Sequence, residues 1–188
     1  IVYQPQNLNK EGVPENVEEN QKLIAGKSYK VHELIQRMIV YSDNMATVAL
    51  IDHLNINLAK MFKDFGITFS KKEGLLYLTA KSYGAIFRIL YNSTYISPKN
   101  SEKVLALLSQ SDFPHGLRKA LPKSVRVANK FGARHPQVDK NYQLHDCGII
   151  YTKQPYHLCV MTKGEKLSQL SRVIVQISER LYQLQKTN

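Results

Sequence analysis

Apolar residues recur with the 3.6-residue period of an α-helix over much of the chain. The first such segment predicts a helix over residues 31–39, whose inner face carries Val31, Leu34, Ile35, Met38 and Ile39. Further helices are predicted over residues 46–54, 58–65, 79–91 and 101–109. A closing helix is predicted from residue 165, with one apolar face formed by Leu167, Leu170, Ile174, Ile177 and Leu181.

The second half of the chain changes to short runs rich in β-branched and aromatic residues. Strands are predicted over residues 125–130, 144–152 and 156–162, and Lys153-Gln154-Pro155 indicates a hairpin turn between the last two. Residues 67–78 are predicted to be loop and turn. The order of helices, antiparallel strands and one final helix predicts an α+β fold in which that helix covers the sheet. We expect residues 1–120 to form a mainly helical part and residues 121–188 to form the strands and closing helix.

The junction between the first two helices carries the polar triplet Ser42-Asp43-Asn44. Any of these three side chains could accept hydrogen bonds from the free N–H groups at the start of the second helix. Thr79 suits the same position before a later helix, and Gly66 suits the left-handed conformation that ends one. The triplet is therefore predicted to lie on a tight junction between two helices with apolar faces.

The composition excludes several classes of protein but does not indicate a function. The 188 residues are 43% hydrophobic and 22% charged, as in ordinary globular proteins, and no apolar run approaches the roughly 18 residues of a membrane span. Two cysteines are too few for a disulfide scaffold. With Thr152 opposite His157, Cys147 would face Thr162 and Cys159 would face Ile150. This register favours two half-buried thiols over a disulfide.

The net charge of +11 is unevenly distributed. From Ser111 onward thirteen basic residues stand against five acidic ones, which favours attraction of anionic ligands or polymers. The lysines are scattered and form no nucleic-acid-binding module, so we expect no nucleic-acid partner. The histidines show no metal-ligand spacing, and we expect no metal or organic cofactor. His135 is close enough to the first strand to be a candidate for ligand contact.

Two short motifs carry the candidate chemistry, and their order is informative. Ser42-Asp43-Asn44 lies between helices, and Lys130-Phe131-Gly132-Ala133 follows 88 residues later on the first strand. The segments 145–151 and 155–158 then supply the last two strands. This arrangement, from about residue 28 to the C-terminus, resembles the penicillin-recognising serine hydrolases, namely class A β-lactamases and D,D-peptidases.

The resemblance implies a β-lactamase/transpeptidase-like fold and a set of roles. Ser42 would relay a proton to the leaving nitrogen, and Lys130 would supply positive charge to Ser42 and to the substrate carboxylate. Asn44 would hydrogen-bond the substrate amide, and the backbone N–H of Ala133 would donate to the oxyanion. Asp43 would brace the junction. The remaining candidates for substrate contact are Tyr41, Phe131, Gly132 and Arg134, the last as a partner for a carboxylate. The alternatives are that Arg134 is an ordinary surface residue and that Tyr41 only packs the end of the first helix.

Three features depart from that family. No serine is followed by a lysine three positions on, so the acylated serine is not in this sequence, and we expect a fragment or C-terminal piece lacking the first strands. Phe131 replaces the usual Thr or Ser that binds the carboxylate. The short stretch 66–78 offers only Glu73 as a deacylating base. Efficient β-lactam hydrolysis is therefore disfavoured, and a peptidase-like or degenerate role is favoured.

The sequence thus predicts a serine hydrolase that acts on β-lactam or D-Ala-D-Ala-type amides through an acyl-enzyme. Its substrate would be a small molecule or a peptidoglycan peptide. The resemblance also implies a location outside the cytoplasm. The alternative is a catalytically inactive member of the family that binds a cell-wall peptide or a protein partner through the same cleft.

Overall fold

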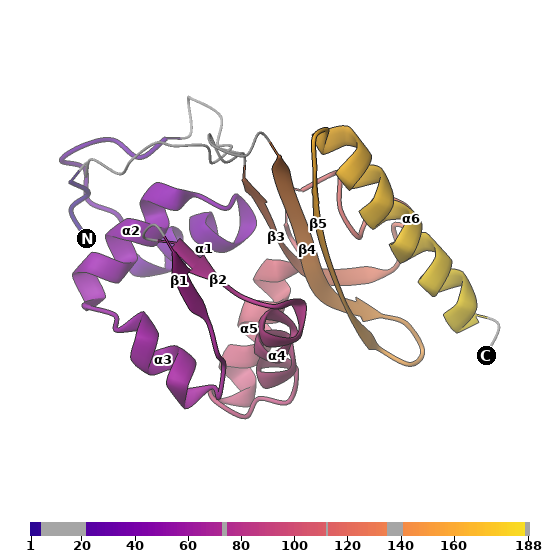
Figure 1. The fold of residues 1–188 in the computed structure, drawn as a ribbon. Coiled ribbons are helices and arrows are strands. Elements are labelled where there is room, and N and C mark those ends of the chain that lie inside the picture. Colours follow the sequence, from indigo (N-terminus) through magenta and orange to yellow (C-terminus); the bar gives the residue numbers. More distant parts are fainter. Residues whose placement is uncertain (5–21, 73–74, 112, 135–140, 187–188) are drawn as a thin grey trace.

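The computed structural model describes residues 1–4, 22–72, 75–111, 113–134 and 141–186. A three-stranded antiparallel sheet, whose strands are neighbours in chain order, lies between the layer of shorter helices and one long helix (Figure 1). This arrangement confirms the predicted α+β class. The division into subdomains at residue 120 stays a prediction.

The helical layer contains α1 (Val31–Val40), α2 (Asn44–Leu54), α3 (Leu58–Asp64), α4 (Ala80–Tyr91) and α5 (Pro98–Leu108). Thr79 caps α4 by accepting from the Ser82 N–H, as predicted. Gly66 follows α3 with φ of 64°, also as predicted. Helix α5 begins three residues earlier than expected, because Ser97 caps it and Pro98, which has no N–H to satisfy, fits its first position.

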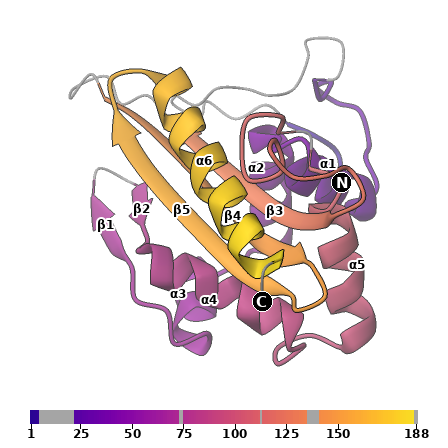
Figure 2. The same ribbon diagram turned by 90° about the vertical axis from the view of Figure 1, so that its right-hand side faces the viewer.

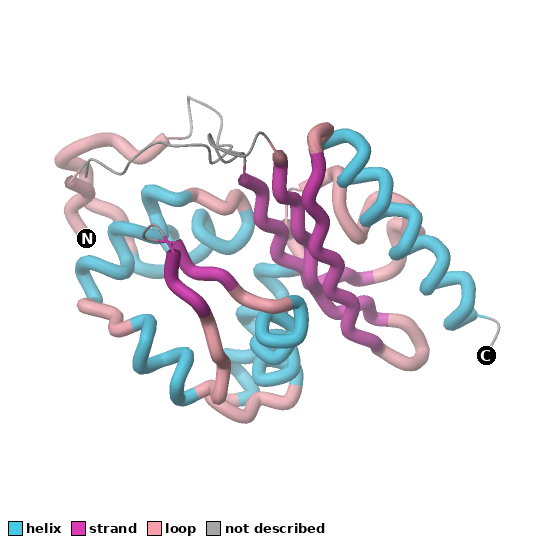
Figure 3. The backbone as a smooth tube through the Cα atoms, viewed as in Figure 1, coloured by secondary structure: helices cyan, strands magenta, loops and turns pink. Residues whose placement is uncertain are grey.

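The sheet consists of β3 (Arg126–Arg134), β4 (Tyr142–Tyr151) and β5 (Tyr156–Gly164), and α6 (Leu167–Lys186) runs across its outer face (Figures 2 and 3). On β3, Val127 joins the core under α6, whereas Ala128 joins the core under α4 and α5. This alternation is the two-residue period of a strand. Strand β3 does not end at Lys130 as expected, because its pairing with β4 continues to Arg134 opposite Gln143.

Two further expectations were wrong. Residues 67–78 are not only loop and turn, since β1 (Ser70–Lys72) and β2 (Leu75–Tyr77) pair there as a short antiparallel hairpin. Ile177 of α6 is 36% exposed instead of inward-facing. The buried residues of α6 instead recur at every fourth position, namely Leu170, Ile174, Ser178 and Tyr182. The hydroxyl of Ser178 donates to the Leu117 carbonyl at 2.7 Å.

The register between β4 and β5 also differs from the predicted one. Pairing ends at Ile150 opposite Tyr156, and Thr152 turns into the loop, where its hydroxyl donates to the Gln154 carbonyl. Cys147 therefore lies directly opposite Cys159 instead of Thr162, and the two form a disulfide. The expected pair of half-buried thiols is corrected accordingly. Among the described residues, no helix combines the length and the apolar character needed to cross a membrane.

Gly148 is predicted to be indispensable to the β3–β4 pair. A Cβ on Gly148 would come within 2.6 Å of the Ala128 carbonyl oxygen and 2.7 Å of the Asn129 Cβ, whereas a Cβ on Gly132 would meet nothing within 4 Å. We expect Gly148→Ala to lower the free energy of unfolding by roughly 1–3 kcal/mol, as overpacking does. Urea denaturation measures this, with Gly132→Ala as the matched control. Equal effects of the two substitutions would contradict the observed close approach.

The disulfide gives a second prediction. Native protein denatured without reductant should show no thiol that alkylates, and reduced protein should show two, because both cysteines are paired. The disulfide joins residues 12 positions apart and so restricts the unfolded chain. Reduction should therefore lower the free energy of unfolding by roughly 2–3 kcal/mol. Mass spectrometry after alkylation, followed by urea titration, measures both. Two alkylated thiols before reduction would contradict the pairing.

Candidate active site

The Ser42 junction is held in place by its neighbour Asp43. Ser42 has φ of 56°, a left-handed conformation that costs energy in a residue with a Cβ. The buried Asp43 carboxylate caps α2 by accepting from the N–H groups of Met45 and Ala46. Its other oxygen accepts from the Arg37 guanidinium of α1 at 2.9 Å. The two helices are thereby tied to the turn that presents Ser42.

Lys130 reaches Ser42 from the sheet. Its Nζ donates to Ser42 Oγ at 2.5 Å and to the Phe131 carbonyl at 3.2 Å. The first of these hydrogen bonds joins residues that lie 88 positions apart in the sequence. The pair of residues singled out as catalytic from sequence is therefore in direct contact.

Burial sets the charge state of Lys130. Desolvation lowers the pKa of its ammonium to about 8, although the negative charge of Asp146 acts in the opposite direction. Lys130 is therefore mainly protonated at neutral pH, while a proton can leave it at little cost. A lysine with this pKa suits the transfer of protons to and from a neighbouring hydroxyl.

Asp146 forms a buried polar centre on β4 that sequence reasoning did not assign to the site. Its carboxylate accepts from the Leu117 N–H at 2.8 Å and from the Asn129 side-chain amide at 3.0 and 3.1 Å. Burial raises the pKa of Asp146 to about 6, opposed by these hydrogen bonds and by the charge of Lys130. The sequence feature that could have indicated a buried polar partner is Asn129, a polar residue directly before Lys130 in an otherwise apolar strand.

The Phe131 ring lies beneath the Lys130 ammonium, with Nζ 4.5 Å from the ring centroid. The same ring stacks on Phe113, with centroids 4.1 Å apart and planes 13° apart. Phe131 is buried. Phe113 was not anticipated, because nothing in its local sequence links it to Phe131.

The remaining predicted contacts lie further along β3. Gly132 is exposed, and Ala133 and Arg134 are half-buried. All three line a cavity of about 300 Å³ that also involves Tyr77 and His145. Arg134 donates to the Tyr77 hydroxyl at 3.0 Å, so β2 positions its guanidinium. Burial lowers the pKa of His145, opposed by a hydrogen bond that the imidazole donates to the Leu144 backbone.

Tyr41 and Asn44 flank Ser42 and are both half-buried. The Tyr41 N–H donates to the Arg37 carbonyl at the end of α1, and Asn44 is the first residue of α2. Glu73 and His135 lie outside the described residues. Within the described part of the chain, no three His, Cys, Asp or Glu side chains gather closely enough to hold a metal ion.

The pKa of Lys130 predicts a specific pH dependence of stability. The unfolded chain, with an ordinary lysine pKa of 10.5, binds more protons than the folded chain between about pH 8 and 10.5. The charged Lys130 therefore lowers the free energy of unfolding by its full amount below pH 8, and this loss becomes smaller as the pH rises from 8 to 10.5. We expect the stability of Lys130→Met relative to the wild type to fall by roughly 1–3 kcal/mol between pH 7 and 10.

Urea denaturation at both pH values measures this difference, and Lys153→Met is the control, because Lys153 is exposed in the β4–β5 turn. The comparison of variant with wild type removes the common titration of the tyrosines. A stability difference that stays constant with pH for Lys130→Met would contradict a lowered Lys130 pKa.

Comparison with solved structures shows the same fold. PBP-A matches with a TM-score of 0.76 and 19% identity, over 95% of this chain and 72% of that one. A PBP-A variant, solved as an acyl-enzyme complex with penicillin G, matches with a TM-score of 0.75 and 19% identity over the same shares. The TLA-3 extended-spectrum β-lactamase matches with a TM-score of 0.77 and 16% identity, over 85% of this chain and 66% of that one.

Comparison with curated protein sequences finds no match. The family model described as the β-lactamase enzyme family, in contrast, matches residues 4–185. This match covers nearly the whole sequence, including the Ser42 junction, the Lys130 strand and α6. The chain therefore belongs to the β-lactamase enzyme family.

Proposed function

We propose that this chain is the part of a serine hydrolase that binds substrate and relays protons, with the acylated serine supplied by a segment not in this sequence. Its substrates would be β-lactams or D-Ala-D-Ala-type amides. The hydrogen bond from Lys130 Nζ to Ser42 Oγ is the observation that carries the proposal. Membership of the family and the acyl-enzyme seen in a PBP-A variant support it.

The contact between Ser42 and Lys130 defines a proton path. The Lys130 ammonium donates to Ser42 Oγ, which leaves the hydroxyl hydrogen of Ser42 free to point at a substrate nitrogen. When the amide bond breaks, Ser42 gives that proton to the leaving nitrogen and takes one from Lys130. The lowered pKa of Lys130, about 8, keeps the second transfer inexpensive. Both residues act as general acid–base groups in this scheme.

Binding would use the strand that follows Lys130. The positive charge of Lys130 attracts the substrate carboxylate, and the exposed backbone of Gly132 allows a ligand to approach β3 closely. The Ala133 N–H would donate to the oxyanion, and Asn44 and Tyr41 would contact the substrate from the Ser42 side. Arg134, positioned by Tyr77, adds a second cation at the far end of the strand.

A second candidate function is favoured by Phe131. Its buried ring replaces a hydroxyl that the family uses for the substrate carboxylate, and it fills space beside Lys130. A site altered in this way would bind a cell-wall peptide or a protein partner without turning it over. In either case, we propose that the protein acts outside the cytoplasm, in keeping with the peptidoglycan-like substrates of this proposal.

The test is acylation of the natural gene product that contains this chain. Incubation with benzylpenicillin should add the mass of the drug to a serine outside residues 1–188. Lys130→Ala should slow the formation of this adduct by about 10²–10³-fold, because general acid–base groups contribute on that scale. Intact-mass spectrometry over time measures the rate, and the exposed Lys153→Ala serves as the matched control.

The outcomes separate the two candidates. An adduct that forms at the same rate in Lys130→Ala and in the wild type would refute the role of Lys130. No adduct at saturating drug, together with retained binding of a D-Ala-D-Ala peptide by calorimetry, would establish the inactive binding protein instead.

A further inference from the structure

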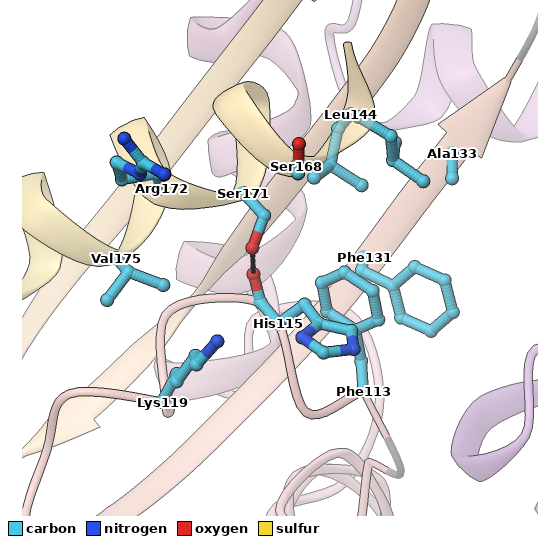
Figure 4. Close-up of a pocket in the computed structure, with 11 residues that line it drawn as sticks. Phe113, His115, Lys119, Phe131, Ala133, Leu144, Ser168, Ser171, Arg172 and Val175 are labelled. Carbon is cyan, nitrogen blue, oxygen red and sulfur yellow. Dashed lines mark hydrogen bonds between the residues drawn. The ribbon is translucent and has the colours of Figure 1, made fainter.

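A second and larger cavity lies on the opposite face of the sheet from Ser42. It measures about 720 Å³, is open to solvent on one side, and is lined by α6, by residues 113–119 and by the ends of β3 and β4 (Figure 4). Its volume is in the range of small-molecule sites. Ser42 and Lys130 do not line it, and it shares with the candidate active site only the side chain of Phe131 and the neighbouring Ala133. We name it the α6 pocket.

The floor of the α6 pocket is apolar and partly aromatic. The stacked rings of Phe113 and Phe131 form one side, together with Leu144, and Val175 of α6 adds apolar surface at the far end (Figure 4). A flat ring placed against this pair can stack on it in an offset arrangement, which adds to the gain from burying apolar area. The floor therefore favours a planar, apolar body over a polar one.

The rim is cationic. Lys119 comes from the loop and Arg172 from α6, and both side chains, like that of His115, are exposed at the edge of the pocket (Figure 4). No acidic side chain is present among the described residues that line it. A guanidinium and an ammonium on opposite walls suit a single carboxylate or sulfonate held between them. The charge of the rim thus complements an anion.

The walls of the pocket are fastened to each other. Ser171 of α6 donates its hydroxyl proton to the His115 carbonyl at 2.7 Å, the bond drawn in Figure 4. Two turns further along α6, Ser178 donates to the Leu117 carbonyl at 2.7 Å, and the Leu117 N–H is itself held by Asp146. The loop and α6 are therefore fixed without a ligand, so binding does not have to order them.

We propose that the α6 pocket binds a small anion with an aromatic body, an aryl carboxylate or aryl sulfonate. The ring of the ligand lies against Phe113 and Phe131, and its acid group lies between Lys119 and Arg172. An alkyl carboxylate satisfies the rim in the same way but does not use the stacked rings. Binding at this site involves no bond cleavage and does not use Ser42 or Lys130.

The experiment uses 8-anilinonaphthalene-1-sulfonate, an aryl sulfonate whose fluorescence rises on transfer to an apolar site. Titration of the intact chain should give saturable binding with one site. We expect Lys119→Ala combined with Arg172→Ala to weaken binding at least tenfold. The matched control combines Lys123→Ala with Arg180→Ala, which removes the same charges from exposed positions outside the pocket and should change binding less than twofold.

Further variants and ligands test separately whether binding needs the pocket, the negative charge and the aromatic body. Val175→Phe should reduce binding by filling the pocket, and circular dichroism verifies that each variant is folded. The neutral analogue N-phenyl-1-naphthylamine should bind at least tenfold more weakly than the sulfonate, and 1-naphthoate should displace the probe at lower concentration than dodecanoate. Equal losses in the two double variants, equal binding of the neutral analogue, or preferential displacement by dodecanoate would overturn the proposal.

Discussion

The antiparallel pairing of β3 with β4 decides which side of the sheet each residue of the Lys130 segment faces. Lys130 lies opposite Cys147, so its side chain joins the face that carries the helical layer, where Ser42 is in reach. Phe131 lies opposite Asp146 and faces α6. A shift of one residue would exchange these faces and separate Lys130 from Ser42. The close approach of Gly148 to Ala128 and Asn129 helps to hold the register.

The same pairing brings two buried charges near each other across the sheet. Asp146 is fully buried, and its hydrogen bonds from Asn129 and Leu117 compensate for much of the lost hydration. Lys130 is only half-buried and contacts a hydroxyl and a carbonyl, neither of which carries a formal charge. Desolvation lowers the pKa of Lys130 and raises that of Asp146. The two groups keep their ordinary charges at neutral pH partly because of each other.

Much of the fold and the central contact of the site followed from the sequence. Helical periodicity located most helices, and the motifs at Ser42 and Lys130 indicated a shared site before their contact was known. The register of β4 with β5 did not follow, because residues 151–155 form a wider turn than Lys153-Gln154-Pro155 alone implied. Partners such as Tyr77 and Phe113 were missed because their roles depend on tertiary packing and leave no mark on local sequence.

The position of β3 at one side of the sheet has a consequence for recognition. Among the described strands, β3 pairs only with β4, so one row of its backbone N–H and C=O groups is not part of a ladder. An extended ligand backbone laid beside residues 130–134 can add a strand there, with affinity supplied by its peptide groups and selectivity by alternate side chains. A proline in that ligand removes one donor, and a helical ligand cannot match the spacing at all. The edge of β3 thus favours ligands with an extended backbone, whatever their side chains are.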